Sequence, residues 1–294
     1  MTQAIFVGLS TIDIVYSVDK FPTSNTKVAA QSQEVFVGGP TTNAAITFAH
    51  LGGKAALVTA VGRHPLSHMI REELQKYAVR LVDLNPKFDE VPVISSVTVD
   101  RKGHRNVVSA NATRVQTPAA EVDINVCRQA SIVMVDGHYM QNCQAWAQAA
   151  RANNIPVVFD GGSWKEGSED LLKSVNTAIC SADFRPPGCK TRDSVIEFLK
   201  NAGVASIAIT DGAEPIQFAS GATSGTLRIP PVEVVDTMGA GDVFHGAYCY
   251  FASAGRGFVE SLAEAANIAA ESCRFRGVRE WMRAVPVESL ALQV

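Results

Sequence analysis

Short apolar runs alternate with amphipathic or alanine-rich segments along most of this chain. The runs occupy residues 4–9, 55–62, 131–137, 155–162, 177–181 and 206–212. The segments between them include residues 41–52, 66–78, 144–153 and 192–203. Strands that are apolar throughout are typical of sheets covered on both faces, and helices between them are typical of crossover connections. We therefore expect an α/β fold with a mainly parallel central sheet.

Two regions interrupt this alternation. Residues of about 13–37 and 92–110 read as half-buried, hairpin-like strands with polar turns such as "DRKG". Together they predict a small accessory sheet, inserted as a lid over the main body. After about residue 241 the pattern is helical to the end, with a break at 255–257. Because no repeat or long linker is present, we expect a single domain over residues 1–294.

Composition narrows the class of partner. The 294 residues include 26 Lys and Arg against 29 Asp and Glu, and no basic block is present. This balance does not favour nucleic acid or an anionic membrane as partner, whereas a small-molecule substrate fits. The first residues lack the features of a signal peptide and no apolar run spans a bilayer, so we expect a cytoplasmic protein. The six cysteines form no CxxC pair and are interpreted as structural thiols.

The stretch "VVDTMGAGDVFHGAYCYF" at 234–251 carries the clearest chemical signal. We expect 230–235 to form a strand and 243–254 a helix, which places Gly239 to Asp242 at the helix start. Free backbone amides there attract an anion, and small residues let it approach. An acid at the same place can accept a proton from an alcohol that attacks a bound phosphoryl group. The alternative is that Asp242 only caps the helix.

Other phosphate-binding motifs are excluded. The segments "LGGKAA" and "PGCKT" each lack residues that a GxxxxGK[ST] loop requires. In "GAGDVF", Phe244 stands where a dinucleotide fingerprint has its third glycine, and the segment lies late in the chain. The sequence therefore predicts neither a P-loop nor an NAD site.

Two motifs resemble those of one family. "DTMGAGDVFHGA" is similar to the C-terminal signature of the ribokinase-like (PfkB) carbohydrate kinases, and "VGGPTTNAAITFAHLG" at 37–52 resembles their N-terminal signature. The resemblance covers nearly the whole chain. It implies a three-layer sandwich with a small β-sheet lid, phosphorylation of a sugar hydroxymethyl group by ATP with Mg²⁺, and a homodimer formed through the lid.

The resemblance also implies roles for particular residues. Asp242 matches the catalytic base, and the anion hole matches Gly239, Ala240 and Gly241. Asp13 and Asn43 match positions that hold sugar hydroxyls, although each could instead be an ordinary strand-end or helix-start residue. The backbone has room for the substrate at Gly38 and Gly39.

Nucleotide and metal positions follow in the same way. The resemblance places ATP near Gly212, Thr237, Gly241 and Asn267, and places K⁺ in many members near Asp236 and the turn at 273–277. The family's Asn-x-x-Glu motif, which organises Mg²⁺, is replaced here by Ser181 and Phe184. The magnesium ligands therefore stay unassigned, with Asp160 and Asp183 as nearby acids that could act through water.

The acceptor is the most open question. Lys27, Arg105 and His138 stand where ketohexokinase-like and sulfofructose kinase-like members carry charged substrate contacts, which suits an anionic sugar. They could instead be ordinary surface charges. A nucleoside kinase of the same fold is the alternative acceptor class, with Tyr16, Phe21 and Phe36 as the lid aromatics. A catalytically inactive, sugar-sensing member is the non-enzyme alternative.

Overall fold

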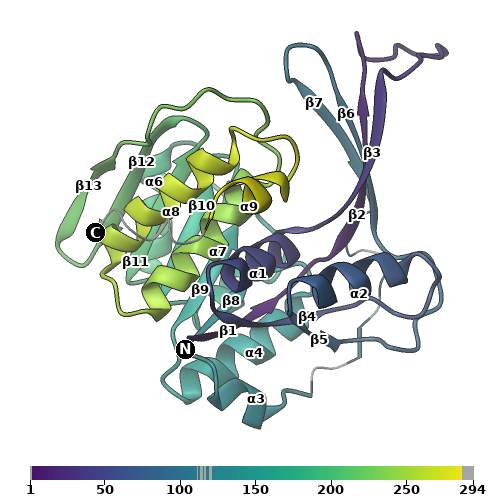
Figure 1. Ribbon diagram of the computed structural model, residues 1–294. Helices are drawn as coiled ribbons and strands as arrows, with labels where there is room; N and C mark the ends of the chain where they lie inside the picture. The colour runs from purple at the N-terminus through teal and green to yellow at the C-terminus, as the bar shows by residue number, and fades with distance from the viewer. Residues whose placement is uncertain (1, 111, 113–114, 116, 119–120, 287–294) are drawn as a thin grey trace.

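A mainly parallel sheet forms the centre of the molecule. A computed structural model describes residues 2–110, 112, 115, 117–118 and 121–286. Within them, one sheet has nine strands in the order β13-β12-β11-β10-β9-β8-β1-β4-β5, parallel from β11 to β5 (Figure 1). The strands are β1 (Gln3–Val7), β4 (Lys54–Thr59), β5 (Arg80–Asp83), β8 (Ile132–Val135), β9 (Val157–Gly161), β10 (Thr177–Ser181), β11 (Ser206–Asp211), β12 (Glu214–Ser220) and β13 (Thr223–Leu227).

Helices cover both faces of this sheet. One layer contains α1 (Pro40–His50), α2 (Ser67–Lys76), α7 (Ala240–Ser253), α8 (Phe258–Ser272) and α9 (Glu280–Ala284). The other contains α3 (Ile124–Arg128), α4 (Met140–Ala152), α5 (Ser168–Leu172) and α6 (Arg192–Asn201). Alternate residues of β1 belong to the two cores, Phe6 to the first and Ile5 to the second. The α/β sandwich expected from the sequence is confirmed.

A separate small sheet stands away from the body (Figure 1). Its strands are β2 (Thr11–Ser17), β3 (Ser32–Gly38), β6 (Ile94–Val99) and β7 (Arg105–Ser109), in the order β3-β2-β6-β7. The outer pairs β2–β3 and β6–β7 are antiparallel, and β2–β6 is parallel. The "DRKG" turn closes β6–β7, with the Gly103 amide donating to the Asp100 carbonyl oxygen at 3.0 Å. The small sheet was expected from the two interruptions of the sequence pattern.

One predicted strand is wrong. Residues 230–235 are an exposed loop, with Val234 and Val235 57% and 61% exposed. Pro230 and Pro231 cannot donate to a sheet ladder, and the amide of Val235 donates instead to the Cys273 carbonyl oxygen at 2.8 Å. The antiparallel β12–β13 edge hairpin was not predicted. Helix was expected to the end of the chain, and 287–294 lie outside the described residues.

The helical layer that contains α1 and α7 brings the two motif segments together. Both helices pack on the same face of the sheet and contact each other. Their N-termini meet at the base of the small sheet, beside the start of β2. No helix in the described part of the chain is both long and apolar enough to cross a membrane.

Candidate active site

The glycine-rich turn before α7 has the geometry of an anion seat. Gly239 has φ 70°, and a Cβ there would lie 2.4 Å from Val278 Cγ1, so only glycine fits. A Cβ on Gly241 would meet nothing within 4 Å, so the space above it is open. The amide of Ala240 donates to the Thr237 carbonyl oxygen at 3.3 Å, whereas those of Gly241 and Asp242 have no acceptor among the described residues. Two free amides therefore face open space beside the Asp242 carboxylate.

Asn43 joins this turn to the N-terminal motif. It lies in the first turn of α1, where its amide donates to the Gly39 carbonyl oxygen at 3.0 Å. Its side-chain Nδ2 donates to Asp242 Oδ2 at 2.7 Å. Residues 199 positions apart in the sequence are thus in direct contact, and one oxygen of the Asp242 carboxylate is occupied.

Asp13 faces the same space from the small sheet. Its Oδ1 accepts a hydrogen bond from Thr11 Oγ1 at 2.7 Å. A Cβ on Gly38, in the neighbouring strand, would lie 2.0 Å from Asp13 Oδ2, so glycine leaves the room that this carboxylate occupies. Burial raises the pKa of Asp13, against hydrogen bonds from Thr11 and Ser95. The side chain is therefore held in place and partly shielded from water.

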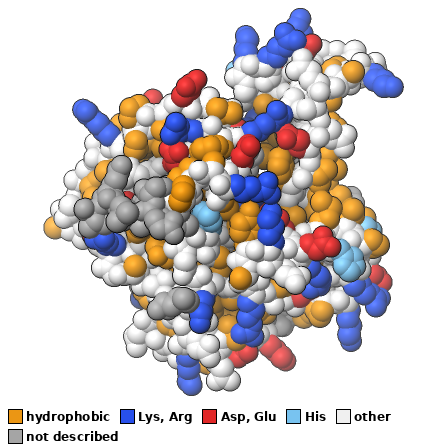
Figure 2. All heavy atoms as spheres, viewed as in Figure 1, with side chains coloured by type: hydrophobic (Ala, Val, Ile, Leu, Met, Phe, Trp, Pro, Cys, Tyr) orange, Lys and Arg blue, Asp and Glu red, His pale blue; other side chains and the backbone are white. Residues whose placement is uncertain are grey.

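A cleft of about 280 Å³ brings most of the predicted substrate residues together. Its lining includes Asp13, Gly39, Asn43, Arg105, His138, Gly239 and Asp242, with Ser95 and Ser109 from the small sheet. Lys27 does not line it: this residue is exposed on the loop between β2 and β3. Figure 2 shows Lys and Arg side chains gathered over the tip of the small sheet, away from the cleft. The cleft volume is close to the lower end of the range for small-molecule sites, roughly 300 Å³.

Buried charges around Asp242 change its acidity. Burial and the nearby Asp160 carboxylate raise the pKa of Asp242 to about 7, although the Asn43 hydrogen bond and His245 act in the opposite direction. Asp160 follows the apolar part of β9, and burial raises its pKa as well. An acid whose pKa lies near neutral pH is suited to accept a proton during turnover.

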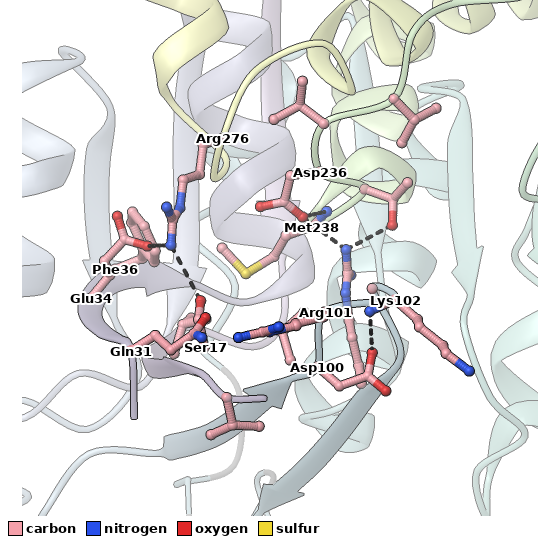
Figure 3. Close-up of a pocket in the computed structure, with 18 residues that line it drawn as sticks. Ser17, Gln31, Glu34, Phe36, Asp100, Arg101, Lys102, Asp236, Met238 and Arg276 are labelled. Atoms are coloured by element: carbon pink, nitrogen blue, oxygen red, sulfur yellow. Dashed lines mark hydrogen bonds and ion pairs between the residues drawn. The ribbon is translucent and has the colours of Figure 1, made fainter. Parts of the chain in front are cut away.

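A second, larger cavity of about 600 Å³ continues from the cleft, because Arg105 and Met238 line both (Figure 3). Arg105 Nη2 donates to Asp236 Oδ1 at 2.9 Å and to Thr237 Oγ1 at 2.7 Å. The amide of Gly277 donates to the other oxygen of Asp236 at 2.9 Å. The small sheet is thereby tied to the loop that leads into the anion seat.

The predicted nucleotide residues lie elsewhere. Gly212 forms the exposed turn between β11 and β12, with φ 54°. Asn267 is half-buried on α8. Among the described residues, neither lines the two cavities beside the small sheet. Thr237 lines the larger cavity, and Gly241 lies at the start of α7. The four ATP positions stay predictions.

The residues at the family's magnesium motif do not form a cation site. Phe184 is fully buried and packs edge-on against Phe159, with ring centroids 5.7 Å apart. Asp183 is exposed, and an oxygen of Asp160 lies 3.6 Å from His245 Nε2. Within the described residues, no group of three or more His, Cys, Asp or Glu side chains could hold a metal. A divalent ion here would depend on nucleotide phosphates and water.

Sequence reasoning missed two buried basic side chains behind the cleft, His245 and Arg279. The ring nitrogens of His245 lie 2.7 Å and 3.1 Å from the carbonyl oxygens of Gly241 and Ile179. Arg279, after the last glycine turn, donates to Asn43 Oδ1 at 2.8 Å. The helical spacing of "GDVFHGA" could have placed His245 on the buried face of α7. No local sequence pattern distinguishes Arg279 from other arginines.

Comparison with known proteins identifies relatives over the whole fold. The model of the pfkB family carbohydrate kinases matches residues 1–284. A ribokinase of Haemophilus influenzae is 19% identical, over 82% of each chain, and an aminoimidazole riboside kinase of Salmonella typhimurium is 24% identical, over 80% of each. The ribokinase structure of Thermotoga maritima superposes with a TM-score of 0.83 at 22% identity, covering 99% of this chain and 98% of that one. That of Arabidopsis thaliana ribokinase, a complex with ribose and ATP, gives 0.80 at 20%, with the same coverage.

Proposed function

The chain belongs to the pfkB family of carbohydrate kinases and is a phosphotransferase, and on this premise we propose that it transfers the γ-phosphate of ATP to a hydroxymethyl group of a small sugar or sugar derivative. One observation carries the proposal. Asp242 and Gly239 line the same 280 Å³ cleft as Asp13, and the free amides of Gly241 and Asp242 lie at the start of the same helix. An acid, an anion seat and a polar substrate cleft are the parts that phosphoryl transfer to an alcohol requires.

Asp242 acts as the general base. Its Oδ2 is held by Asn43, and its other oxygen accepts the proton of the attacking hydroxyl. The pKa of about 7 leaves the carboxylate ionised in a large share of molecules at neutral pH, yet basic enough to take the proton.

The amides of Gly241 and Asp242 stabilise the charge on the phosphoryl group. They are fixed by the helix, so they need no rearrangement when that charge develops. The closely packed turn at Gly239 holds the first residues of α7 in position. Gly239, Ala240 and Gly241 thus form the anion hole.

Asp13 and Asn43 hold hydroxyl groups of the sugar, and the backbone of Gly38 and Gly39 lies against it. His138, after β8, and Arg105, at the start of β7, also line the cleft. Arg105 carries a positive charge there, and burial lowers the pKa of His138, which favours its neutral form. Arg105, although paired with Asp236, is the positive charge in the cleft that suits a sugar with an anionic group, and Lys27 would reach the cleft only if the small sheet or its loop moved.

ATP approaches the anion hole from the side of Gly212 and Asn267, with Thr237 beside the phosphates. Magnesium bound to the phosphates would neutralise their charge during transfer. Because the described residues form no cage of their own for that ion, the nucleotide and water supply its ligands.

Potassium at Asp236 is the least supported part of the family pattern here. Both oxygens of this carboxylate already accept hydrogen bonds, and Arg105 supplies a positive charge 2.9 Å away. We therefore expect Arg105 to match the charge of Asp236, so that K⁺ at this site is dispensable while the arginine is present.

The small sheet forms a homodimer interface in this proposal. On the face turned away from the cleft, Val35, Ile14, Ser96 and Val108 lie in one cross-strand row. Val35 and Val108 are 43% and 75% exposed. An exposed β-branched face between open sheet edges is stabilised by pairing with a second copy.

A nucleoside kinase is the second candidate, favoured by the similarity to an aminoimidazole riboside kinase. Of the three lid aromatics, Phe36 lines the larger cavity and none lines the cleft, whereas the cleft contains two acids and three hydroxyl side chains, which favours a sugar. An ATP-turnover screen over ketoses, aldoses, sugar acids, sugar phosphates, sulfosugars and nucleosides tests the proposal. A sugar should give the highest kcat/KM. A nucleoside in first place would overturn the acceptor class, and no turnover with any of them would favour the sugar-sensing alternative.

A further inference from the structure

We propose that Arg279 is a positioning residue of the reaction: anchored by Glu73, it fixes the side-chain amide of Asn43 so that this amide donates its hydrogen bond to Asp242. The proposal rests on the function proposed above for Asp242. It adds Arg279 and Glu73, which do not line the cleft, and it proposes that they orient the hydrogen bond that Asp242 accepts from Asn43.

A continuous series of side-chain hydrogen bonds runs from the surface helix α2 to the cleft. Arg279 Nε donates to Glu73 Oε1 at 3.1 Å, and Arg279 Nη2 donates to Asn43 Oδ1 at 2.8 Å. Asn43 Nδ2 then donates to Asp242 Oδ2 at 2.7 Å. The middle of this series is shielded from water, because Arg279 and Asn43 are 7% and 3% exposed.

Arg279 decides which way the Asn43 amide points. A primary amide has one accepting end and one donating end, whereas a guanidinium can only donate. With Oδ1 facing Arg279, Nδ2 must face Asp242. The opposite orientation would set the NH₂ group against the guanidinium and the carbonyl oxygen against the carboxylate, two repulsive contacts in a buried site. Backbone carbonyl oxygens of Val37 and Val278, at 3.3 Å and 3.2 Å, occupy further guanidinium donors.

Arg279 acts from behind the substrate cleft. It does not line that cleft but a separate cavity of about 560 Å³ between β3, α2 and α9. Its influence on the reaction must therefore pass through Asn43 or through its electric field. This distinguishes it from Asp13 and Asn43, which line the cleft directly.

Ionisable side chains surround both ends of this hydrogen-bond series, Asp242 and Arg279. Asp242 is faced by Asp13 of β2, Asp160 of β9 and His245 of its own helix. Arg279 is faced by Glu73 of α2, by Tyr77 directly after that helix, and by Asp242 and Asp13. Since Asp13 and Asp160 disfavour the ionised form of Asp242, the Asn43 donor is the hydrogen bond that supports it.

The experiment measures the pKa of Asp242 directly, by ¹³C NMR titration of side-chain carboxyls, with Asp242→Asn to assign the signal. In Arg279→Met the Asn43 amide is free to turn, so the pKa should rise by about 1–2 pH units, as loss of a hydrogen bond to a charged group implies. The acidic limb of the pH profile of kcat/KM should move upward with it. Arg283→Met, which removes an exposed cation from the same cavity, is the matched control and should leave the pKa unchanged.

Two further variants protect the test against misfolding and indirect effects. Glu73→Gln combined with Arg279→Met leaves no unpaired buried charge, and it should show the same upward movement. In an Asn43→Ala background, Arg279→Met should lose most of its effect, because the donor through which it acts is already gone.

The outcomes separate this inference from the proposed function. An unchanged Asp242 pKa in both Arg279 variants would overturn the positioning role, whatever the activity. A raised pKa in a protein whose Asp242→Asn variant remains active would leave the contacts intact but remove Asp242 as base. An equal shift in Arg283→Met would reduce the effect to general electrostatics and also overturn the role of Arg279.

Discussion

Asn43 Nδ2 donates to Asp242 Oδ2 across 2.7 Å, and this hydrogen bond joins the starts of α1 and α7. Each motif supplies one half of the contact. The N-terminal motif brings the donor and the Gly39 backbone that lines the cleft, and the C-terminal motif brings the acid and the free amides. The proposed reaction depends on both helix starts being held together, and the packing of α1 on α7 does this.

The raised pKa of Asp242 predicts a pH-dependent cost to stability. Because the folded-state pKa of about 7 exceeds the ordinary value near 4, the folded protein binds this proton more tightly than the unfolded chain does. Stability contributed by the protonated form is full at acid pH and is lost as the pH rises through 7. Asp242→Asn stays neutral, so it should raise the melting temperature by at least a few degrees at pH 8.

The same substitution should change the melting temperature little near pH 4, where the parental side chain is also neutral. Differential scanning calorimetry at both pH values measures the difference. Equal effects of Asp242→Asn at acid and alkaline pH would show that the folded-state pKa is not raised.

Removing the carboxylate of Asp13 should weaken sugar binding more than it slows transfer. A hydrogen bond to a charged group contributes about 1.5–3 kcal/mol, so Asp13→Ala should raise the sugar KM by roughly 10- to 100-fold. The KM for ATP should be unaffected, because Asp13 lies on the small sheet. Steady-state kinetics with both substrates varied measures this, with Asp19→Ala, an exposed acid beyond the end of β2, as control. A parental sugar KM in Asp13→Ala would remove Asp13 from the substrate site.

Arg105 should make the enzyme independent of potassium. Replacing K⁺ by tetramethylammonium should leave the parental rate nearly unchanged, since the guanidinium already faces Asp236. In Arg105→Gln the Asp236 charge is unmatched, and the rate without K⁺ should fall roughly tenfold or more and recover when K⁺ is added. Arg101→Gln is the control, because Arg101 lines the same 600 Å³ cavity as Arg105. A parental enzyme that already needs K⁺ would show that Arg105 does not take its place.

The exposed row on the small sheet should form a dimer contact. Light scattering should give twice the chain mass at micromolar concentration, and Val108→Glu should shift the protein to monomer by placing a charge in the apolar contact. Val259→Glu, at an exposed valine of α8, should leave the dimer intact. A monomeric parental protein would contradict the interface.

The sequence predicts those parts of the fold whose burial requires a recognisable local pattern of residues. Apolar runs such as 155–162 are recognisable because strands buried on both faces need them. The exposed loop 230–235 was misread because its valines look like a strand, although its prolines and exposure prevent one. The placement of Gly239 and Asp242 at a helix start could be predicted because the sequence signal for it is local.

The residues behind the site could not be found in this way. Glu73 and Arg279 are 206 positions apart, and only the packing of α2 against the C-terminal segment brings them together. Phe184 replaces a metal-linked residue of the family pattern, and only the structure shows that its side chain is part of the core. Contacts between distant segments depend on the whole fold, which no short motif encodes.

The most direct test of the account is kcat for Asp242→Asn, measured with the best acceptor from the screen. Asparagine keeps the shape of the side chain and can serve at a helix start, but it cannot take a proton. General base catalysis typically contributes 10²- to 10⁴-fold, so kcat should fall at least about a hundredfold while KM for both substrates changes little. Asp183→Asn, at an exposed acid after β10, should retain parental kcat. A folded Asp242→Asn enzyme that keeps more than about a tenth of the parental kcat would contradict the role of Asp242 as base.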